Sequence, residues 1–379
     1  MSRQATSLDV LRYFHPILPC RALRKRPVQT TIAGRKYVLF RDGSGRAAAL
    51  DDRCPHRYAS LSGGSVRADG RLACPYHGWN FDADGNGRSP SDPRLTHCDT
   101  RAYQVVERLG YLWMAGRETS PSTFPALQWN GFDFAGSLSI TVRAPMDVTL
   151  DNISEDEHFP FVHTTFGWDE NALGEVSIET KAFPDHSEVS YSGRQRATFW
   201  ATLGGVRPGD QFHNQWSTRF DPVHTVYTFG WKDPQSGHDR PITTRAAVFL
   251  VPETSTRTRI EMFLFLKIAP SIYSWLGSLM HRLARHVARM ELRRDVRLIE
   301  NVADAPGKLE GMRLTRFDHA LIYNRKLLQS LYLSAAGPDA PVVAAPTTHN
   351  AVARSQNHEG TGPVIPLAPS EPIPTKAIQ

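Results

Sequence analysis

The first third of the chain alternates short runs of β-branched and aromatic residues with sequences typical of turns. KYVLF, AAALDD and GYLWMAG are separated by stretches such as DGSG, ADG and DADGNG. This pattern is typical of antiparallel strands joined by tight turns, and it leaves no room for a long helix. The sequence therefore predicts a small antiparallel β domain over residues 8–118.

The pattern changes after the linker sequence GRETSPSTFP. Within residues 126–335, PMDVTLDNISEDEH predicts a helix, the segments up to about residue 268 favour strands, and a long helix is predicted from near Ser271. A shorter helical run, FDHALIYNRKLLQSLY, closes this part. Residues 336–379 are rich in proline and poor in large apolar side chains, which predicts a disordered tail. We expect an α+β chain of two domains followed by that tail.

The long helix is predicted to be amphipathic. Its apolar side carries Leu279, Leu283, Val287 and Met290, and its other side carries Arg282, His286, Arg289, Arg293 and Arg297. We interpret the basic side as a solvated face, with a docking surface for an acidic protein such as an electron donor as the alternative. At 100° per residue Arg294 falls on the apolar side, so the helix is expected to kink or to leave the core there.

Charge and composition exclude several classes of protein. The 379 residues carry a net charge of +6, but aromatic residues are not interleaved with the basic ones, so we expect no nucleic-acid partner. The first residues lack the regions of a signal peptide, and four cysteines are too few for a disulfide framework, which indicates a reducing, cytoplasmic setting. Lys267 and Pro270 interrupt the apolar segment 262–280, so no membrane span is expected.

Two of the cysteines belong to a regular Cys-His pattern. The stretch CPHRYASLSGGSVRADGRLACPYHGW places Cys54 with His56 and Cys74 with His77 at the ends of a glycine-rich loop. Zinc accepts two Cys and two His, but its usual spacing pairs like with like. One thiolate and one imidazole from each short loop instead suit a [2Fe–2S] cluster of Rieske type. We predict such a cluster, with zinc as the alternative.

A second group of candidate ligands lies in DNISEDEHFPFVH, residues 151–163. In an unbroken helix, His158 and His163 would point about 140° apart and could not share an ion. Pro160 is therefore expected to kink the chain, to push Phe159 towards an extended conformation and to turn both imidazoles inward. In a chain with fifteen histidines such a pair is a weak signal by itself, and ordinary core or surface histidines are the alternative.

Both patterns resemble those of one family. CPHR…CPYHGW is similar to the cluster-binding motif of Rieske-type non-haem iron oxygenases, in particular the single-subunit type of vanillate O-demethylase and dicamba monooxygenase. Residues 152–163 fit N-x-x-(D/E)-x-x-H-x-x-x-x-H, which resembles the mononuclear-iron motif of that family. The resemblance covers about residues 8–335. It implies a Rieske domain followed by a helix-grip (START-like) catalytic domain with an antiparallel sheet and a long C-terminal helix.

The resemblance also implies residue roles. His158 and His163 would bind Fe(II), and Asn152 would support them. Glu155 would be the acidic bridge through which a neighbouring subunit's cluster histidine, His77, communicates with His158. The usual residue at the bridge is Asp, so the longer Glu leaves the details of this coupling open.

A site with two histidines and one carboxylate needs an acid from elsewhere in the chain. The candidates are Asp295, Glu291 and Asp318. We choose Asp295, because it lies near the edge of the apolar side of the long helix. RRDVRLIENV also resembles the segment from which the family supplies this Asp.

The implied function is that of a terminal oxygenase. The sequence GSGRAA is followed within six residues by Cys54 and not by a helix, so it is not a dinucleotide-binding motif. Electrons must therefore come from a separate NAD(P)H-dependent reductase, a ferredoxin or both. With O2, Fe(II) would hydroxylate or oxidatively demethylate a small aromatic or heterocyclic substrate. The resemblance implies a homotrimer in which the cluster of one subunit serves the iron of the next. Mono-oxygenation, dioxygenation, demethylation and cyclisation stay open, and a Rieske electron-transfer protein without oxygenase activity is the alternative.

Overall fold

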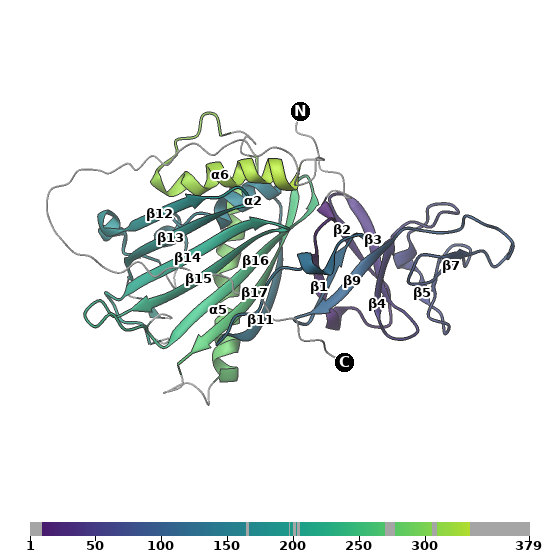
Figure 1. Ribbon diagram of the computed structural model, residues 1–379, viewed down its shortest axis with the longest axis horizontal. Coiled ribbons are helices and arrows are strands. Elements are labelled where there is room, and N and C mark those ends of the chain that lie inside the picture. The colour runs from purple at the N-terminus through teal and green to yellow at the C-terminus, as the bar shows by residue number, and fades with distance from the viewer. Residues whose placement is uncertain are drawn as a thin grey trace. The chain divides into compact units, whose positions relative to one another are not determined.

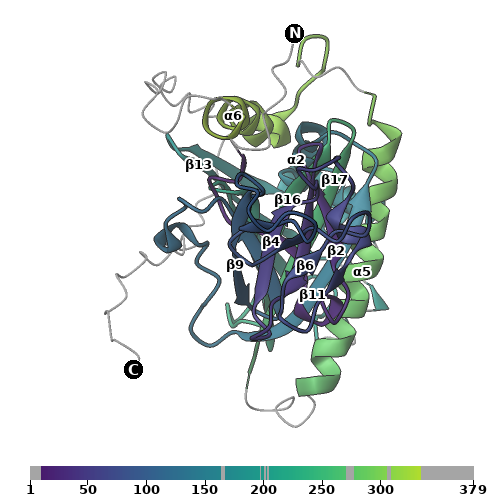
Figure 2. The ribbon, with the colours of Figure 1, turned by 90° about the vertical axis from the view of Figure 1, so that its right-hand side faces the viewer.

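The computed structural model describes residues 10–163, 167–196, 198–199, 202, 205–269, 277–304 and 309–333 (Figures 1 and 2). The predicted tail and the predicted start of the long helix near Ser271 lie outside these residues. Among the described helices, none combines the length and the apolar character that a membrane crossing requires.

The N-terminal part forms two antiparallel sheets. The larger sheet has the strand order β1-β10-β9-β4-β3-β2. Its strands are β1 (His15–Pro19), β2 (Val28–Ile32), β3 (Arg35–Arg41), β4 (Ala47–Asp51), β9 (Ala102–Arg108) and β10 (Tyr111–Ala115). The smaller sheet, in the order β5-β6-β7-β8, consists of β5 (Ser65–Val66), β6 (Leu72–Ala73), β7 (Asn80–Phe81) and β8 (Gly87–Arg88). One candidate cluster loop follows β4 and the other joins β6 to β7, so the strands set where both loops begin.

The second part is built on one seven-stranded antiparallel sheet in the order β11-β17-β16-β15-β14-β13-β12 (Figure 1). Its strands are β11 (Asp133–Val142), β12 (Ser177–Ala182), β13 (His186–Arg194), β14 (Gln211–Phe220), β15 (Val223–Lys232), β16 (Ile242–Thr254) and β17 (Arg257–Ile268). Buried and partly exposed residues alternate strictly along β14, as expected of a strand with one face on the core. The predicted α+β class, with an antiparallel sheet in each domain, is confirmed.

Helices cover this sheet. They are α2 (Met146–Ile153), α3 (Phe159–Val162), α5 (Gly277–Asn301) and α6 (His319–Leu327), the last of which runs into a π-helical turn at Leu328–Tyr332. The long α5 helix packs along the sheet against β11 and β17, and Figure 2 shows it extended beside the strands. Leu292, Val296 and Ile299 bury its apolar side. The helix-grip arrangement expected from the sequence is present.

Two expectations for α5 are wrong. The helix runs unbroken past Arg294, because the Arg294 side chain reaches a carboxylate on its own helix: Nη1 donates to Glu291 Oε2 at 2.8 Å. A long arginine can thus lie at the edge of the apolar side without a kink. Leu279 is 57% exposed, so the buried side begins only at Met280.

The six-stranded and the seven-stranded sheet share one hydrophobic core. Its members include Ile32 and Leu112 from the N-terminal part and Val251 and Ile260 from the second part. Across the same boundary, Tyr111 Oη donates to Glu261 Oε2 at 2.7 Å. Burial of apolar surface between the parts therefore holds them in one packed unit.

Candidate metal centres

Cys54 and Cys74 each begin a loop with the same hydrogen-bond pattern. The N–H of Tyr58 donates to the carbonyl of Cys54 at 2.8 Å, and the N–H of Gly78 donates to the carbonyl of Cys74 at 3.1 Å. The N–H of each cysteine also donates to the carbonyl five residues later, at 2.9 and 2.7 Å. Two short sequences of similar composition thus fold into two loops of one shape, each of which presents a thiol and an imidazole.

Thiols and imidazoles occupy different depths in these loops. Cys54 and Cys74 are buried, whereas His56 and His77 are exposed, with ring centroids 4.7 Å apart. Burial raises the pKa of Cys54 to about 11, so a thiolate there requires a cation close by. A Rieske cluster has one iron bound by sulfur and one by nitrogen. The residues present therefore fit that cluster, with its histidine side towards solvent.

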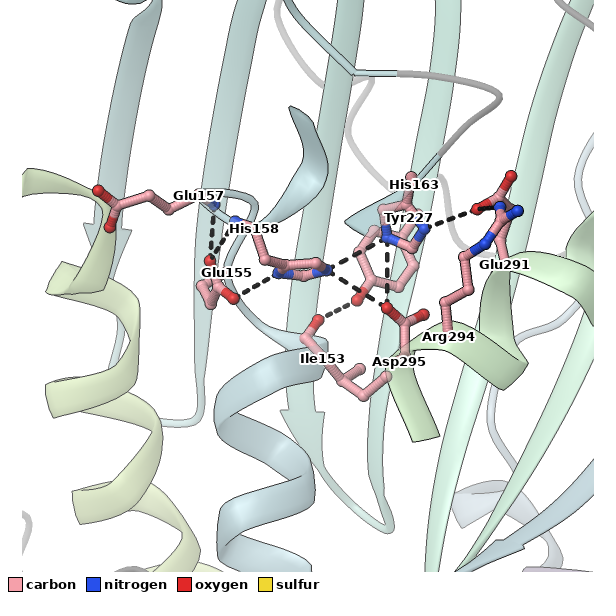
Figure 3. A network of polar contacts seen from close by, with 9 residues as sticks. All are labelled: Ile153, Glu155, Glu157, His158, His163, Tyr227, Glu291, Arg294 and Asp295. Atoms are coloured by element: carbon pink, nitrogen blue, oxygen red, sulfur yellow. Dashed lines mark hydrogen bonds and ion pairs between the residues drawn. The ribbon is translucent and has the colours of Figure 1, made fainter. Parts of the chain in front are cut away.

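A second set of ligand atoms converges in the other part of the chain (Figure 3). The Nε2 atoms of His158 and His163 lie 3.2 Å apart. Asp295 Oδ1 lies 3.4 Å from the first and 3.3 Å from the second. In the described part of the chain, these three are the one group of three or more His, Cys, Asp or Glu whose ligand atoms all lie within 4.8 Å of one another.

The local chain path brings the two histidines together differently from the expectation. Helix α2 ends at Ile153, before either histidine. His158 precedes the short helix α3 and His163 follows it, so the ligands flank one turn of helix. Pro160 stands at the second position of that turn, where its missing N–H costs nothing. The expected extended conformation of Phe159 is wrong, because a helix that begins at Phe159 has no preceding turn for the proline ring to meet.

A carboxylate holds the outer nitrogen of each imidazole. His158 Nδ1 makes a close contact with Glu155 Oε1, and His163 Nδ1 lies 2.9 Å from Glu291 Oε2. Figure 3 shows Glu155 and Glu291 on opposite sides of the histidine pair. Such contacts orient a ligating imidazole and fix which nitrogen faces the metal. Both Nε2 atoms are therefore directed towards Asp295.

The site carries an excess of negative charge. Burial opposes a charge on His158, but the nearby carboxylates of Glu155 and Asp295 outweigh it and raise the pKa of His158 to about 10. Cis ligands at about 2.1 Å from a metal ion lie about 3 Å from one another, close to the spacing of the three ligand atoms here. Distances and charge together fit a divalent cation held by two imidazoles and one carboxylate.

The remaining predicted site residues lie as follows. Glu291, an alternative third ligand, contacts His163 from its outer side, away from the point where the three ligand atoms meet. Asp318, the other alternative, accepts a hydrogen bond from the N–H of Thr315 at 2.7 Å and so caps the segment before α6. Asn152 lines a cavity beside the three ligand atoms, and its buried Oδ1 has no hydrogen-bond partner among the described residues.

A cavity of about 200 Å³ opens beside the three ligand atoms. It is bounded by α2 and α3 on one side, by strands β14 to β17, and by α5. Apolar and aromatic side chains of β14 to β17 and α5 make up most of its wall. A concave, mostly apolar space next to a metal site is the usual form of a small-molecule binding site.

Sequence reasoning missed the residues that hold the metal-ligand segment in place. Asp156 is fully buried and accepts a hydrogen bond from Asn214 Nδ2 at 2.9 Å. Tyr227 Oη donates to the carbonyl of Ile153 at the end of α2. Asn214 and Tyr227 come from β14 and β15, so no local pattern signals them. The run of acidic residues around Asp156 is the feature of the sequence that could have indicated a buried polar contact here.

Two known family models match the chain, one in its N-terminal part and one in its second part. Residues 14–101 match the model of the Rieske [2Fe-2S] domain, and residues 142–334 match that of the vanillate O-demethylase oxygenase C-terminal domain. The chain therefore belongs to the Rieske-type non-haem iron oxygenases with a vanillate O-demethylase type of second domain. The predicted resemblance is confirmed, and the predicted cofactors, a [2Fe–2S] cluster and a mononuclear iron, are those of this family.

Individual relatives are distant. The chain is 31% identical over 212 residues to the chloroplast protein TIC 55 of Pisum sativum, covering 51% of this chain and 37% of that protein. It is 29% identical over 243 residues to the vanillate O-demethylase oxygenase subunit of Pseudomonas sp. (strain ATCC 19151), covering 59% and 73%. A crystal structure of dicamba monooxygenase with 3,6-dichlorosalicylic acid has a TM-score of 0.73 at 20% identity, over 84% of this chain and 97% of that one. The chain spans less than half the length of the first curated relatives it matches.

Proposed function

We propose that the protein is the terminal oxygenase of a multicomponent Rieske system. One observation carries the proposal: His158, His163 and Asp295 converge at a mostly apolar cavity in a chain that also has a Rieske domain. A ligand set beside a substrate-sized space is what an oxygenase requires, whereas an electron carrier has no use for it.

In this proposal, the two loops hold the [2Fe–2S] cluster through Cys54, Cys74, His56 and His77. His158, His163 and Asp295 hold Fe(II), which when bound supplies activation of O2 with electrons from the cluster. Glu291 keeps His163 in its orientation, and the apolar wall of the cavity excludes water from the substrate. The product is a hydroxylated substrate, or a demethylated one where a methyl group on oxygen or nitrogen is attacked.

We further propose a homotrimer with electron transfer between subunits. His56 and His77 are exposed, so the cluster lies where another protein can approach it. Glu155 contacts the outer nitrogen of His158 and so offers a polar route from the protein surface to the iron site. A reductase or ferredoxin supplies the electrons. The four free cysteines are consistent with a reducing, cytoplasmic setting.

Single-turnover chemistry tests the oxygenase proposal. The protein is reduced without O2, then mixed with 18O2 and a panel of aromatic, heterocyclic and N- or O-methylated compounds. We expect at least one compound to accelerate reoxidation of the cluster, followed by absorption spectroscopy, and to yield a product that carries 18O by mass spectrometry. Reoxidation at one rate with every compound, without labelled product, would instead support a Rieske electron carrier.

A further inference from the structure

The charged side chains of the cavity lie at one end only. Its described lining includes three carboxylates, those of Glu155, Glu291 and Asp295, and no lysine or arginine. All three belong to the metal site, where Glu155 and Glu291 contact the histidines and Asp295 faces both Nε2 atoms. Away from the metal site, a bound substrate would therefore meet no ammonium or guanidinium group in the described wall.

Most of the rest of the wall is apolar, and the neutral amides of Asn152 and Asn214 also line it. Strand β16 contributes Ile242, Thr244, Ala246 and Val248, which are alternate residues and so share the face towards the cavity. Helix α5 contributes small and branched side chains such as Ala284 and Val287. Together with the rings of Phe229 and Trp231 on β15, these side chains present a mostly apolar, uncharged surface to a substrate.

Two arginines of these elements, Arg245 and Arg294, are directed elsewhere. Arg245, between Thr244 and Ala246, lies over the rings of Trp129 and Phe132 at 5.1 and 4.8 Å, on the opposite face of β16. Arg294 donates to Glu291 at 2.8 Å and is not part of the described lining. Between residues 164 and 276, the positions that the structure does not describe contain no lysine or arginine in the sequence.

We propose that this cavity selects an uncharged, mostly apolar aromatic substrate and rejects aromatics that carry a carboxylate or sulfonate. The inference rests on the oxygenase function proposed above and narrows its substrate class. A carboxylate that enters the cavity loses its water and gains no lysine or arginine partner from the described wall, which makes its burial costly. Vanillate, after which one relative is named, is a carboxylate, so the two proteins would differ in substrate charge.

Three probes of similar shape test the proposal: 2-methoxynaphthalene, 6-methoxy-2-naphthamide and 6-methoxy-2-naphthoate. Their dissociation constants are measured on the iron-loaded protein at pH 8 by calorimetry, without O2 and without reductant. We expect the naphthalene to bind at least about 100-fold more tightly than the naphthoate, with the uncharged amide between them. Equal binding, or tighter binding of the naphthoate, would overturn the proposal.

A charge introduced into the cavity wall tests whether the protein discriminates between the probes in this cavity. Thr244→Lys places an ammonium group on the cavity face of β16, and Thr243→Lys places the same charge on the neighbouring residue, which does not line the cavity. The preference for the uncharged probes should fall at least about tenfold in Thr244→Lys and stay unchanged in Thr243→Lys. A similar fall of this preference in both variants would contradict the assignment of the charge selectivity to this cavity.

The binding test separates the proposed substrate charge from the proposed oxygenase function. Should Thr244→Lys fail to fold, as judged by loss of the cluster absorbance, the probe series on the unmodified protein decides by itself. Because binding is measured without turnover, a protein that prefers the uncharged probes but forms no labelled product would refute the oxygenase function and leave the charge preference intact.

Discussion

At the candidate iron site, both ring nitrogens of each histidine have a defined contact. The outer nitrogen of each histidine meets a glutamate, and both inner nitrogens face Asp295. Three carboxylates so close together repel one another, and a bound cation relieves that repulsion. The sequence pointed to Asp295 as the third ligand, but it gave no sign that Glu291, one turn earlier on α5, contacts the outer nitrogen of His163.

Asp295→Ala removes the carboxylate that faces both histidines. We expect the mononuclear iron to be lost, so that total iron falls from about three to about two per chain while the cluster absorbance stays the same. Iron and sulfide determination together with the visible spectrum measure this. Glu300→Ala is the matched control on the same helix, because Glu300 pairs with Arg143 at the surface. Full iron content in Asp295→Ala would exclude Asp295 as a ligand.

At the scale of elements, helix α2 is where sequence and structure differ most. The pattern of PMDVTLDNISEDEH predicts a helix through His158, but α2 ends at Ile153. The segment that follows is held by β14 and β15 through Asn214 and Tyr227, and these tertiary hydrogen bonds outweigh the local helical preference. The same contacts put His158 in position.

Arg325 of α6 should be essential for the placement of α2. Its guanidinium is buried and donates to Asp151 and Asp147, with Nε 2.9 Å from Asp151 Oδ1 and Nη1 2.9 Å from Asp147 Oδ2. Arg325→Leu leaves two carboxylates without a partner and should lower the free energy of unfolding by about 3–5 kcal/mol.

Urea titration at pH 7.5 measures this loss. Arg143→Leu breaks an exposed ion pair with Glu300 and should leave the free energy of unfolding nearly unchanged. Similar losses in the two variants would mean that the contact between Arg325 and α2 does not support the fold as described.

On the scale of the whole molecule, the two parts of the chain meet around His15. The first strand carries this fully buried histidine, whose Nε2 lies 2.9 Å from the carbonyl of Val10 and 3.4 Å from Tyr332 Oη near the end of the described chain. Burial, with a smaller contribution from the charge of Arg259, lowers the pKa of His15 to about 4. Residues more than 300 positions apart in sequence thus share one buried polar contact.

This pKa makes stability depend on pH. Between pH 6.5 and 4 the unfolded chain binds a proton at His15 and the folded chain does not, so stability falls as the pH falls through this window. We expect His15 to account for about 2 kcal/mol of the loss in unfolding free energy between pH 7.5 and 5. His15→Gln should show a smaller loss by that amount in urea titrations, and His238→Gln, at an exposed position, should not. An identical pH dependence in all three proteins would contradict a buried neutral His15.

The sequence by itself determined the class of fold, the cluster loops and the histidine pair. Each of these depends on local information: the period of hydrophobic residues, turn residues, and ligands a few positions apart. The tertiary structure decided the rest. It ended α2 early, it placed Glu291 against the outer nitrogen of His163, and it left the described cavity wall without a lysine or arginine. These features depend on which strands and helices meet in space, and contacts between residues far apart in the chain leave no periodic trace in the sequence.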